Sequence, residues 1–510
     1  MGRPFRLTVR ATRHLCFGGV ARRLAPILVV FLLLLASACG HSKGTKKSLE
    51  RQAPPPPTQH FRSRPDLKPP IVRIRTRAHG TALGDIFIAP KMAVVQAGPM
   101  IVDNQGQVVW FHPLNTKGVT DFRAQHYQGK PVLTWWRGRA VKGVGNGYYV
   151  IDDASYRQIA QVRAGHGYSG DVHEFLITPQ GTALFTVYHQ LHVDLSSVGG
   201  PKQGRIFDGI VQEVDIHSGR VLFEWHSYPR VGIKESYVKP PPASKGVKAP
   251  PDDYFHVNSI DVEPDGNLLV SARNTHALYE IDRHTGKILW RLGGKRSDFT
   301  MKPGANFEWQ HDARRRPDGT ITLFDNGAAP PIEKYTRILV LRVDTAAKTV
   351  TLVQSYRHPK RLLTPFEGNA QLLPDGHIFV GWGANPYYTE FDRQGRVLLD
   401  AYFGHGKPPG KDADSYRAYR FAWTGRPAGR PALVVSAGNA YVSWNGATEV
   451  TRWRLLAGPD AGHLRPLRVA AKTGFETAIP VGSSAQYFAV KALDRDGSVL
   501  STSRTVHRVD

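Results

Sequence analysis

The chain has 510 residues, of which 41% are hydrophobic, and this is enough for two or more folding units with packed cores. Its 50 glycines and 37 prolines are spread along the sequence and favour short strands joined by turns over long helices. The formal net charge of +25 does not indicate nucleic-acid binding, because more than half of the surplus lies in residues 1–78 and the rest forms no basic run.

Residues 1–38 are predicted to be a signal peptide, because they hold six arginines, no acidic residue and then an apolar stretch too short to span a membrane. The stretch ends in LASAC, which is similar to a bacterial lipobox whose cysteine, here Cys39, becomes the lipidated first residue. Ordinary cleavage after Ala38 is the alternative. We expect an exported protein at the cell envelope, on the outer face of a bacterial membrane, held there only through this lipid.

Residues 39–78 are rich in lysine, arginine and proline, with four consecutive prolines at 54–57. Such a composition is typical of a semi-rigid, extended segment. We expect a tether that holds the folded body away from the membrane.

Residues 79–426 repeat a pattern of short β-rich runs separated by turns. The clearest unit spans His256 to Gly293, where four strand-like runs and two Gly-containing turns have the size of one propeller blade. Similar units recur on both sides of it, and we count six. The sequence therefore predicts an all-β fold, a six-bladed β-propeller followed by a small β-sandwich.

Residues 427–510 differ in pattern from the repeats before them. The runs VSWNGATEVTRWRLLAG and YFAVKALDRDG alternate apolar and polar residues, as in a two-sheet core. We expect a fibronectin type III-like sandwich, a spacer or docking module without catalytic residues.

Three histidines and one arginine are predicted to meet at the propeller axis. His256 opens an inner strand, and antiparallel pairing returns Arg273 to the same end of the sheet. His311 and His173 precede the turns of their own hairpins at similar spacing. The matching positions of two other blades carry Asn369 and Gln125.

The residue types at this end of the propeller axis favour an anion over a metal ion as the ligand. Three imidazoles suit zinc, but an adjacent guanidinium opposes a dication and binds oxyanions well. Phosphate-binding loops and serine-hydrolase or HExxH motifs do not occur in the sequence. We expect anion chemistry with no metal and no cofactor, although each histidine alone is also compatible with a structural hydrogen-bonding role.

At these residues the sequence resembles the arylsulfotransferase family, the bacterial aryl-sulfate sulfotransferases. The most specific segments are DDYFHVNSIDVEPDGNLLVSARNTHALYEIDRHTGKILWRLGG and FEWQHDARRRPDG. The resemblance implies a six-bladed propeller that moves a sulfuryl group from an aryl sulfate donor to a phenolic acceptor without 3′-phosphoadenylyl sulfate.

The resemblance also implies the roles of individual residues. His311 corresponds to the family's nucleophile, which forms a sulfohistidine and gives ping-pong kinetics. His256, Arg273 and His173 would hold the sulfate oxygens, and Asn258 lies in the same motif with either a binding or a structural role. The segment HEFLITP around His173 departs from the His-rich form of the family.

Three other functions are compatible with the sequence. A non-catalytic envelope propeller would bind a glycan or a protein at its rim. A quinoprotein dehydrogenase would need a quinone, and a zinc-dependent hydrolase would lose activity with a chelator. The sequence does not choose the natural donor and acceptor or the histidine that handles the phenolic proton.

Overall fold

The computed structural model describes residues 55–240 and 250–509, so the predicted signal peptide and Cys39 lie outside the described residues. Apart from two 3₁₀ turns, Ser196–Val198 and Ile233–Glu235, every regular element in these ranges is a strand. None of the helices in these ranges has the length and apolar character that crossing a membrane requires. The all-β prediction is confirmed.

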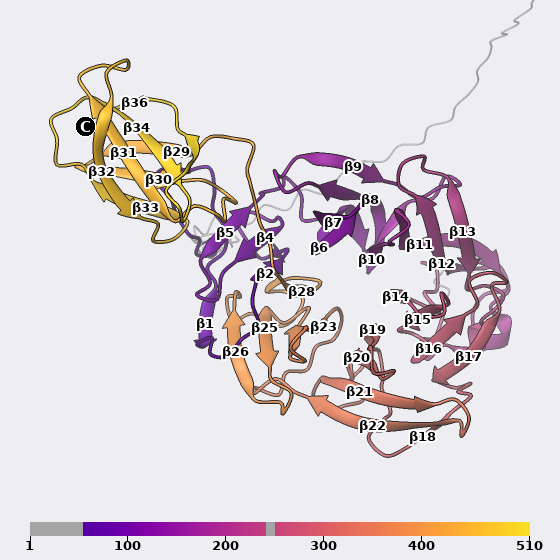
Figure 1. Ribbon diagram of the computed structural model, residues 1–510. Coiled ribbons are helices and arrows are strands. Elements are labelled where there is room, and N and C mark those ends of the chain that lie inside the picture. Colours follow the sequence, from indigo (N-terminus) through magenta and orange to yellow (C-terminus); the bar gives the residue numbers. More distant parts are fainter. Residues whose placement is uncertain (1–54, 241–249, 510) are drawn as a thin grey trace, which may run out of the picture. The chain divides into compact units, whose positions relative to one another are not determined.

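Antiparallel sheets follow one another around a common axis (Figure 1). The first sheet has the order β28 (Ala418–Phe421), β2 (Asp85–Ile88), β4 (Met100–Val102) and β5 (Val108–Phe111). The next set is β6 (Val119–Tyr127), β7 (Lys130–Val141), β8 (Val144–Asp152) and β9 (Gln158–Val162). It is joined through the pair Gly147 and Gly170 to β10 (Gly170–Ile177), β11 (Thr182–Val193), β12 (Gly204–Asp215) and β13 (Val221–His226).

Three further sheets complete the ring. One contains β14 (Val257–Val262), β15 (Leu268–Ala272), β16 (Ala277–Ile281) and β17 (Ile288–Gly293). The next contains β19 (His311–Arg315), β20 (Ile321–Asp325), β21 (Arg337–Asp344) and β22 (Thr349–Tyr356), with β18 (Thr300–Met301) beside β22. The last contains β23 (Asn369–Leu372), β24 (Ile378–Gly381), β25 (Tyr387–Phe391), β26 (Val397–Tyr402) and β1 (Arg73–Thr76). A small separate sheet pairs β3 (Lys91–Met92) with β27 (Ala413–Asp414).

Strands from both ends of the repeat region close the ring. β28 is the last strand of the ring in sequence order but is the edge strand of the first sheet, and β1 comes first but pairs with β26 of the last sheet. β1 lies inside residues 39–78, so the folded body begins earlier than the predicted tether boundary. The physical reason is the alternation in Ile71-Val72-Arg73-Ile74-Arg75, which places Ile74 against a core while the arginines hide the strand signal.

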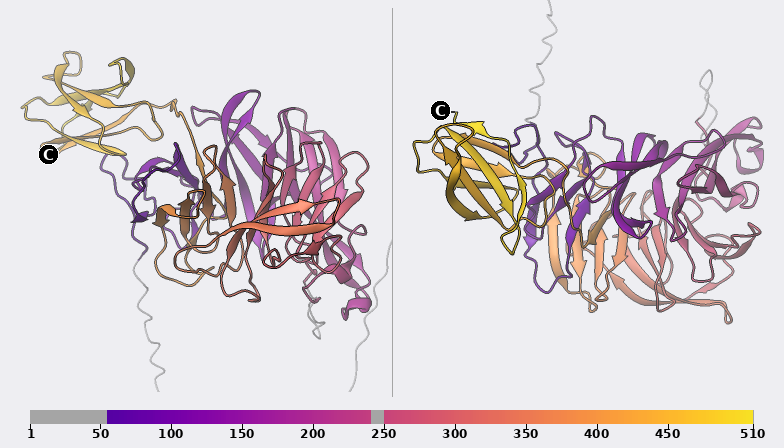
Figure 2. Two further views of the ribbon diagram at one scale, coloured as in Figure 1. Left: turned by 60° about the horizontal axis from the view of Figure 1, so that its bottom comes forward. Right: turned by 45° about the horizontal axis from the view of Figure 1, so that its top comes forward.

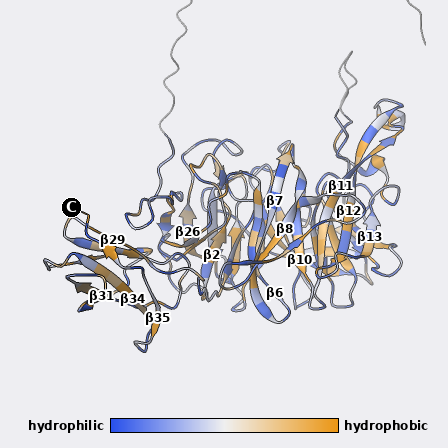
Figure 3. Cartoon of the chain, turned by 90° about the horizontal axis from the view of Figure 1, so that it is seen from above, coloured by the Kyte–Doolittle hydropathy of each residue, from blue (hydrophilic) through white to orange (hydrophobic). Residues whose placement is uncertain are grey.

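The cores lie between neighbouring sheets. Every residue of β15, β20 and β25 is buried, because both faces of these strands are covered by adjacent sheets. Trp225, Tyr254 and Tyr279, for example, belong to one such core. Figure 2 shows the sheets from two further sides, and Figure 3 shows hydrophobic residues alternating with hydrophilic ones along the strands. The ring is therefore held by apolar packing between sheets, and its axis is left to polar side chains.

The C-terminal strands form two sheets with their own core. One sheet has β29 (Ala432–Ser436), β30 (Asn439–Ser443) and β33 (Glu476–Pro480). The other has β32 (Arg465–Ala471), β31 (Arg452–Gly458), β34 (Tyr487–Leu493) and β35 (Val499–Thr502), with β36 (Val506–His507) paired to β34. Trp453, Phe488 and Val490 are buried in the core that the two sheets share.

Candidate active site

The predicted convergence of histidines and arginine is found in the structure. His173, His256, Arg273 and His311 line one cavity of about 790 Å³. The ring centroids of His173 and His256 are 4.8 Å apart, and those of His256 and His311 are 6.4 Å apart. The three imidazoles are therefore close enough to contact one small oxyanion.

Irregular strand ends turn these side chains towards the axis. His311 is the first residue of β19, His256 directly precedes β14, and His173 lies within β10. The pairing register of all three strands shifts at these points, and His256 has a φ of 53°. Bulges of this kind re-aim side chains and occur often beside active sites. The backbone N–H of Arg273 donates to the His256 carbonyl (2.9 Å), as the hairpin geometry predicted.

Each imidazole is oriented by a hydrogen bond at Nδ1. His173 donates to Asp171, and His256 donates to Asp253 at 2.5 Å. His311 Nδ1 lies 2.7 Å from the side-chain oxygen of Asn326. In the described part of the chain the Nε2 atoms of these three rings make no hydrogen bond to protein. They are the nitrogens available to a ligand.

The partners of Asn326 determine the tautomer of His311. The Asn326 amide nitrogen donates to two carbonyls, those of Thr364 and Glu367, both at 3.0 Å. Its oxygen must therefore accept the Nδ1 proton of His311, which leaves a lone pair on Nε2. Burial first, then Arg273 and His256, lowers the pKa of His311 well below 6.5. His311 is a neutral imidazole with a free nucleophilic nitrogen.

Arg273 supplies the positive charge of the cavity. Its guanidinium donates to the Asn274 side chain (2.8 Å) and to the Pro365 carbonyl (3.2 Å), and it stacks over Trp309 at 4.7 Å. Its Nε is buried and has no hydrogen-bond partner in the described residues. Burial lowers the pKa of Arg273 to about 10, so the group stays charged at neutral pH. It is suited to binding an oxyanion through a planar donor edge.

Aromatic side chains complete the cavity wall. Trp136, Phe366 and Tyr416 line it together with the histidines. The ring centroid of Tyr416 lies 5.6 Å from that of His173 at nearly a right angle. These walls can pack against an aryl ring whose anionic substituent points to the imidazoles.

Three polar residues singled out from the sequence do not line this cavity. Asn258 is fully buried, and its amide donates to the Gln310 carbonyl (2.7 Å), so it supports the residue before His311. Asn369 bonds to the backbone of Ala418 at 2.9 Å. The expectation that Gln125 faces the same mouth is wrong: it lines a second cavity, because a register shift earlier in β6 changes which residues reach the axis.

The sequence did not predict the residues that orient the three histidines. Asp171 and Asp253 lie two and three residues before their histidines, a spacing that was visible. Asn326 directly follows β20, as Arg273 directly follows β15, so the two occupy equivalent places in neighbouring sheets. The signals that would have found them are an acid just upstream of His173 and of His256 and a polar residue at the end of the second strand after His311.

A layer of buried ion pairs, centred on Glu174, was also missed. Glu174 is fully buried and bonds to Arg417 at 3.0 Å, to Arg314 at 2.5 Å and to Arg123. Burial alone would raise the pKa of Glu174, but these three guanidinium groups hold it well below its usual value. We call Glu174, Asp121, Asp312 and these three arginines the axial ion layer.

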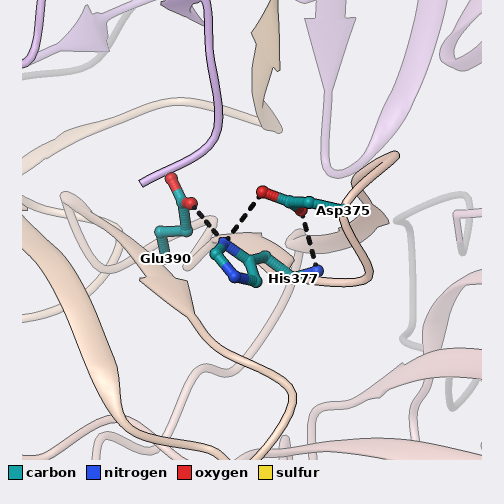
Figure 4. Close-up of side chains that lie close together, drawn as sticks. All are labelled: Asp375, His377 and Glu390. Carbon is teal, nitrogen blue, oxygen red and sulfur yellow. Dashed lines mark hydrogen bonds and ion pairs between the residues drawn. The ribbon is translucent and has the colours of Figure 1, made fainter. Parts of the chain in front are cut away.

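Two groups of side chains in the described ranges have the spacing of metal ligands, and neither contains a cavity histidine. One is Asp375, His377 and Glu390 (Figure 4). Its His377 Nδ1 is shared between Glu390 (3.0 Å) and Asp375 (3.2 Å), and Glu390 also pairs with Arg420 at 2.8 Å. The other is Glu308, Asp325 and Glu333, of which the last two pair with Arg337. Both groups are explained by ion pairs.

Comparisons with solved structures give low similarity. A protein of unknown function from Bacteroides caccae is 13% identical over 62% of this chain and 93% of its own, with a TM-score of 0.36. A catalytically inactive virginiamycin B lyase from Staphylococcus aureus with quinupristin is 9% identical over 78% of this chain and 97% of its own, with a TM-score of 0.31. These likenesses carry no functional argument.

The family comparison is specific. No curated protein matches the chain. The model of the family described as Arylsulfotransferase (ASST) matches residues 123–404, which is more than half of the chain and includes every cavity histidine and Arg273. The chain therefore belongs to the arylsulfotransferase family.

Proposed function

We propose that this protein transfers a sulfuryl group from an aryl sulfate donor to a phenolic acceptor, without 3′-phosphoadenylyl sulfate. Family membership supports an enzyme of this class. The observation that carries the proposal is the free Nε2 of neutral His311 in a cavity that also holds Arg273 and two further imidazoles. A neutral nucleophile beside a fixed cation suits attack on an anionic ester.

The reaction has two half-reactions. In the first, His311 Nε2 forms a bond to sulfur, the donor's S–O bond breaks, and a phenolate leaves. In the second, the acceptor phenol gives up its proton, its oxygen bonds to sulfur and the N–S bond breaks, which returns neutral His311. The phenolate released in the first half-reaction takes up one proton, so each turnover balances. Arg273, His256 and His173 bind the three sulfuryl oxygens, where charge spreads in a loose transition state.

The number of blades, the type of C-terminal domain and the location of the protein are also proposals. Counting each set of four antiparallel strands around the axis as a blade gives a six-bladed propeller, and β29 to β36 would be a fibronectin type III-like sandwich. We propose export to the cell envelope with a lipid on Cys39. Incorporation of labelled palmitate that is lost in Cys39→Ser supports this anchor, and equal labelling of the variant contradicts it.

The test is release of nitrophenol from 4-nitrophenyl sulfate, with and without phenol. Wild type should give a burst stoichiometric with enzyme from donor alone and steady turnover when phenol is added. His311→Ala should lose both by about 10⁴-fold or more. His284→Ala, an exposed histidine outside the cavity, is the matched control and should behave as wild type.

Three outcomes would contradict the proposal. Wild type without any nitrophenol release would favour a binding propeller. Activity that chelator removes would favour a metal-dependent hydrolase. Activity in His311→Ala equal to wild type would remove the nucleophile from the scheme.

A further inference from the structure

Glu367 brings a carboxylate to the cavity that the scheme above does not use. One of its oxygens, Oε1, accepts from Lys91 Nζ at 2.9 Å. Its other oxygen, Oε2, is buried and has no hydrogen-bond partner in the described residues, and the same is true of the Tyr416 hydroxyl. Both residues line the cavity with His311. A ligand hydroxyl bound in this cavity would satisfy both of these buried polar atoms.

The backbone links Glu367 to the nucleophile. The Glu367 carbonyl accepts from Asn326, whose side-chain oxygen holds His311 Nδ1. The next residue, Gly368, donates its N–H to the Tyr416 carbonyl at 3.0 Å. Glu367 has a φ of 66°, a conformation that non-glycine residues adopt mainly where surrounding contacts impose it. The position of this carboxylate is therefore coupled to that of His311.

The charges around Glu367 allow it to gain and lose a proton. Lys91 contacts two carboxylates, Glu367 and Asp414, each at 2.9 Å, so one ammonium serves two acids. Burial and the negative charge of Asp414 outweigh the attraction of Lys91 and raise the pKa of Glu367 to about 7. The charged or titratable groups around Glu367 are Lys91 of β3, Asp414 of β27, His173 of β10, Tyr416, and Arg273, which donates to Pro365 two residues away.

The other titratable groups of the cavity have different tasks. His311 attacks sulfur, and His173 and His256 are each held at Nδ1 by a carboxylate and line the cavity beside it. Burial raises the pKa of Tyr416 well above its usual 10, so its hydroxyl keeps its proton and acts as a donor. Glu367 is a further cavity group, and its pKa of about 7 lets it change protonation state near neutral pH.

We propose, on the basis of the sulfuryl-transfer function, that Glu367 carries the phenolic proton between the two half-reactions. Protonated Glu367 donates its proton to the departing phenolate oxygen as the donor S–O bond breaks. The resulting carboxylate then takes the proton of the acceptor phenol as its oxygen attacks the sulfohistidine. Each turnover moves one proton from acceptor to donor product and returns Glu367 to its acid form. Lys91 positions the carboxylate, and Tyr416 binds the acceptor oxygen.

Glu367→Gln tests this with two donors, because a phenolate that is a good leaving group needs no proton. With 4-nitrophenyl sulfate the variant should keep the nitrophenol burst and the sulfurylated His311, but discharge to phenol should fall by about 10²-fold or more. With unsubstituted phenyl sulfate both half-reactions should slow. Glu280→Gln, a half-buried glutamate on β16 outside the cavity, is the matched control and should be unaffected.

The pH dependence of the acceptor half-reaction in wild type is an independent test of the role of Glu367. The acceptor half-reaction should accelerate as pH rises through about 7, where Glu367 becomes a carboxylate, and then level off. Glu367→Asp should retain this inflection at lower rate, and Glu367→Gln should lose it. This keeps the proposal testable if the glutamine variant folds poorly.

Two results would overturn the proposal. One is a glutamine variant that shows a normal burst and discharges to phenol at the wild-type rate. The other is equal loss of burst and discharge in a folded variant, which would make Glu367 structural. Failure of the sulfuryl-transfer function is distinguishable from both, because wild type itself would then show no burst.

Discussion

The histidine cavity and the axial ion layer lie on the same irregular strand ends. They differ in how completely their buried polar groups are paired. On β10, His173 reaches the cavity and the next residue, Glu174, reaches the ion layer. Three carboxylates of the layer are matched by three guanidinium groups. In the cavity, Arg273 Nε, Glu367 Oε2 and the Tyr416 hydroxyl have no partner among the described residues.

The difference separates stability from function. A buried charge that is paired with opposite charges holds strands from several sheets together and is costly to break. A buried polar atom without a partner costs folding free energy unless a ligand satisfies it. We therefore expect changes in the layer to lower stability first, and changes in the cavity to lower activity first.

The largest expected effect is on stability, from Glu174→Gln. The variant leaves Arg123, Arg314 and Arg417 without their shared anion and should lose about 3–5 kcal/mol of unfolding free energy. Urea unfolding measures this. Because the folded pKa of Glu174 is lowered, its contribution is present above its usual 4.5 and lost as pH falls below it, so the variant should also show a weaker pH dependence there.

The assignment of the ion layer to stability would be wrong if Glu174→Gln unfolded like wild type but had lost the nitrophenol burst. That result would make Glu174 part of the reaction and not of the scaffold. Activity per folded molecule, measured well below the unfolding transition, separates the two cases.

The next effect is on activity, from Arg273→Lys. A lysine keeps the charge but loses the planar donor edge, so the burst rate should fall by about 10²–10³-fold while stability changes little. Stopped-flow nitrophenol release gives the rate, and thermal melting gives the stability. Arg357→Lys, which also replaces an arginine stacked on an aromatic ring (Cζ 5.0 Å from the Tyr335 ring centroid), is the control. An undiminished burst in Arg273→Lys would show that charge alone suffices.

A smaller effect is expected from Asn326→Asp. The carboxylate favours the protonated form of His311 and raises its pKa, and each unit of increase costs about tenfold in neutral nucleophile below that pKa. The burst rate of the variant should therefore fall as pH is lowered, and its high-pH limit should approach wild type. A variant with the same pH profile as wild type would argue against control of His311 through Nδ1.

The smallest expected effect is an absence of change in the wild-type burst rate with pH. The pKa of His311 is lowered, so the group stays deprotonated as pH falls through its usual 6.5. The wild-type burst with 4-nitrophenyl sulfate should then keep its rate across that pH. A tenfold decline per pH unit below 6.5 would mean that His311 titrates normally and is more exposed than the structure indicates.

The sequence predicted the convergence because hairpin length and turn position are local features. His256 and Arg273 face each other across one hairpin, and His311 holds the same place in the next sheet. The features that the sequence did not predict depend on register shifts and on contacts between distant segments. Glu367 meets Lys91 across more than 270 residues, and Gln125 is displaced from the mouth by one bulge. The boundary at residue 78 failed because β1 pairs only with β26, at the other end of the repeat region.

The most direct measurement is mass spectrometry of the protein mixed with an aryl sulfate donor alone. One sulfuryl group should appear on the peptide that contains His311, and it should disappear when phenol is added. An unmodified His311 peptide after nitrophenol has been released, or a sulfuryl group on His173 or His256 instead, would contradict the assignment of the nucleophile.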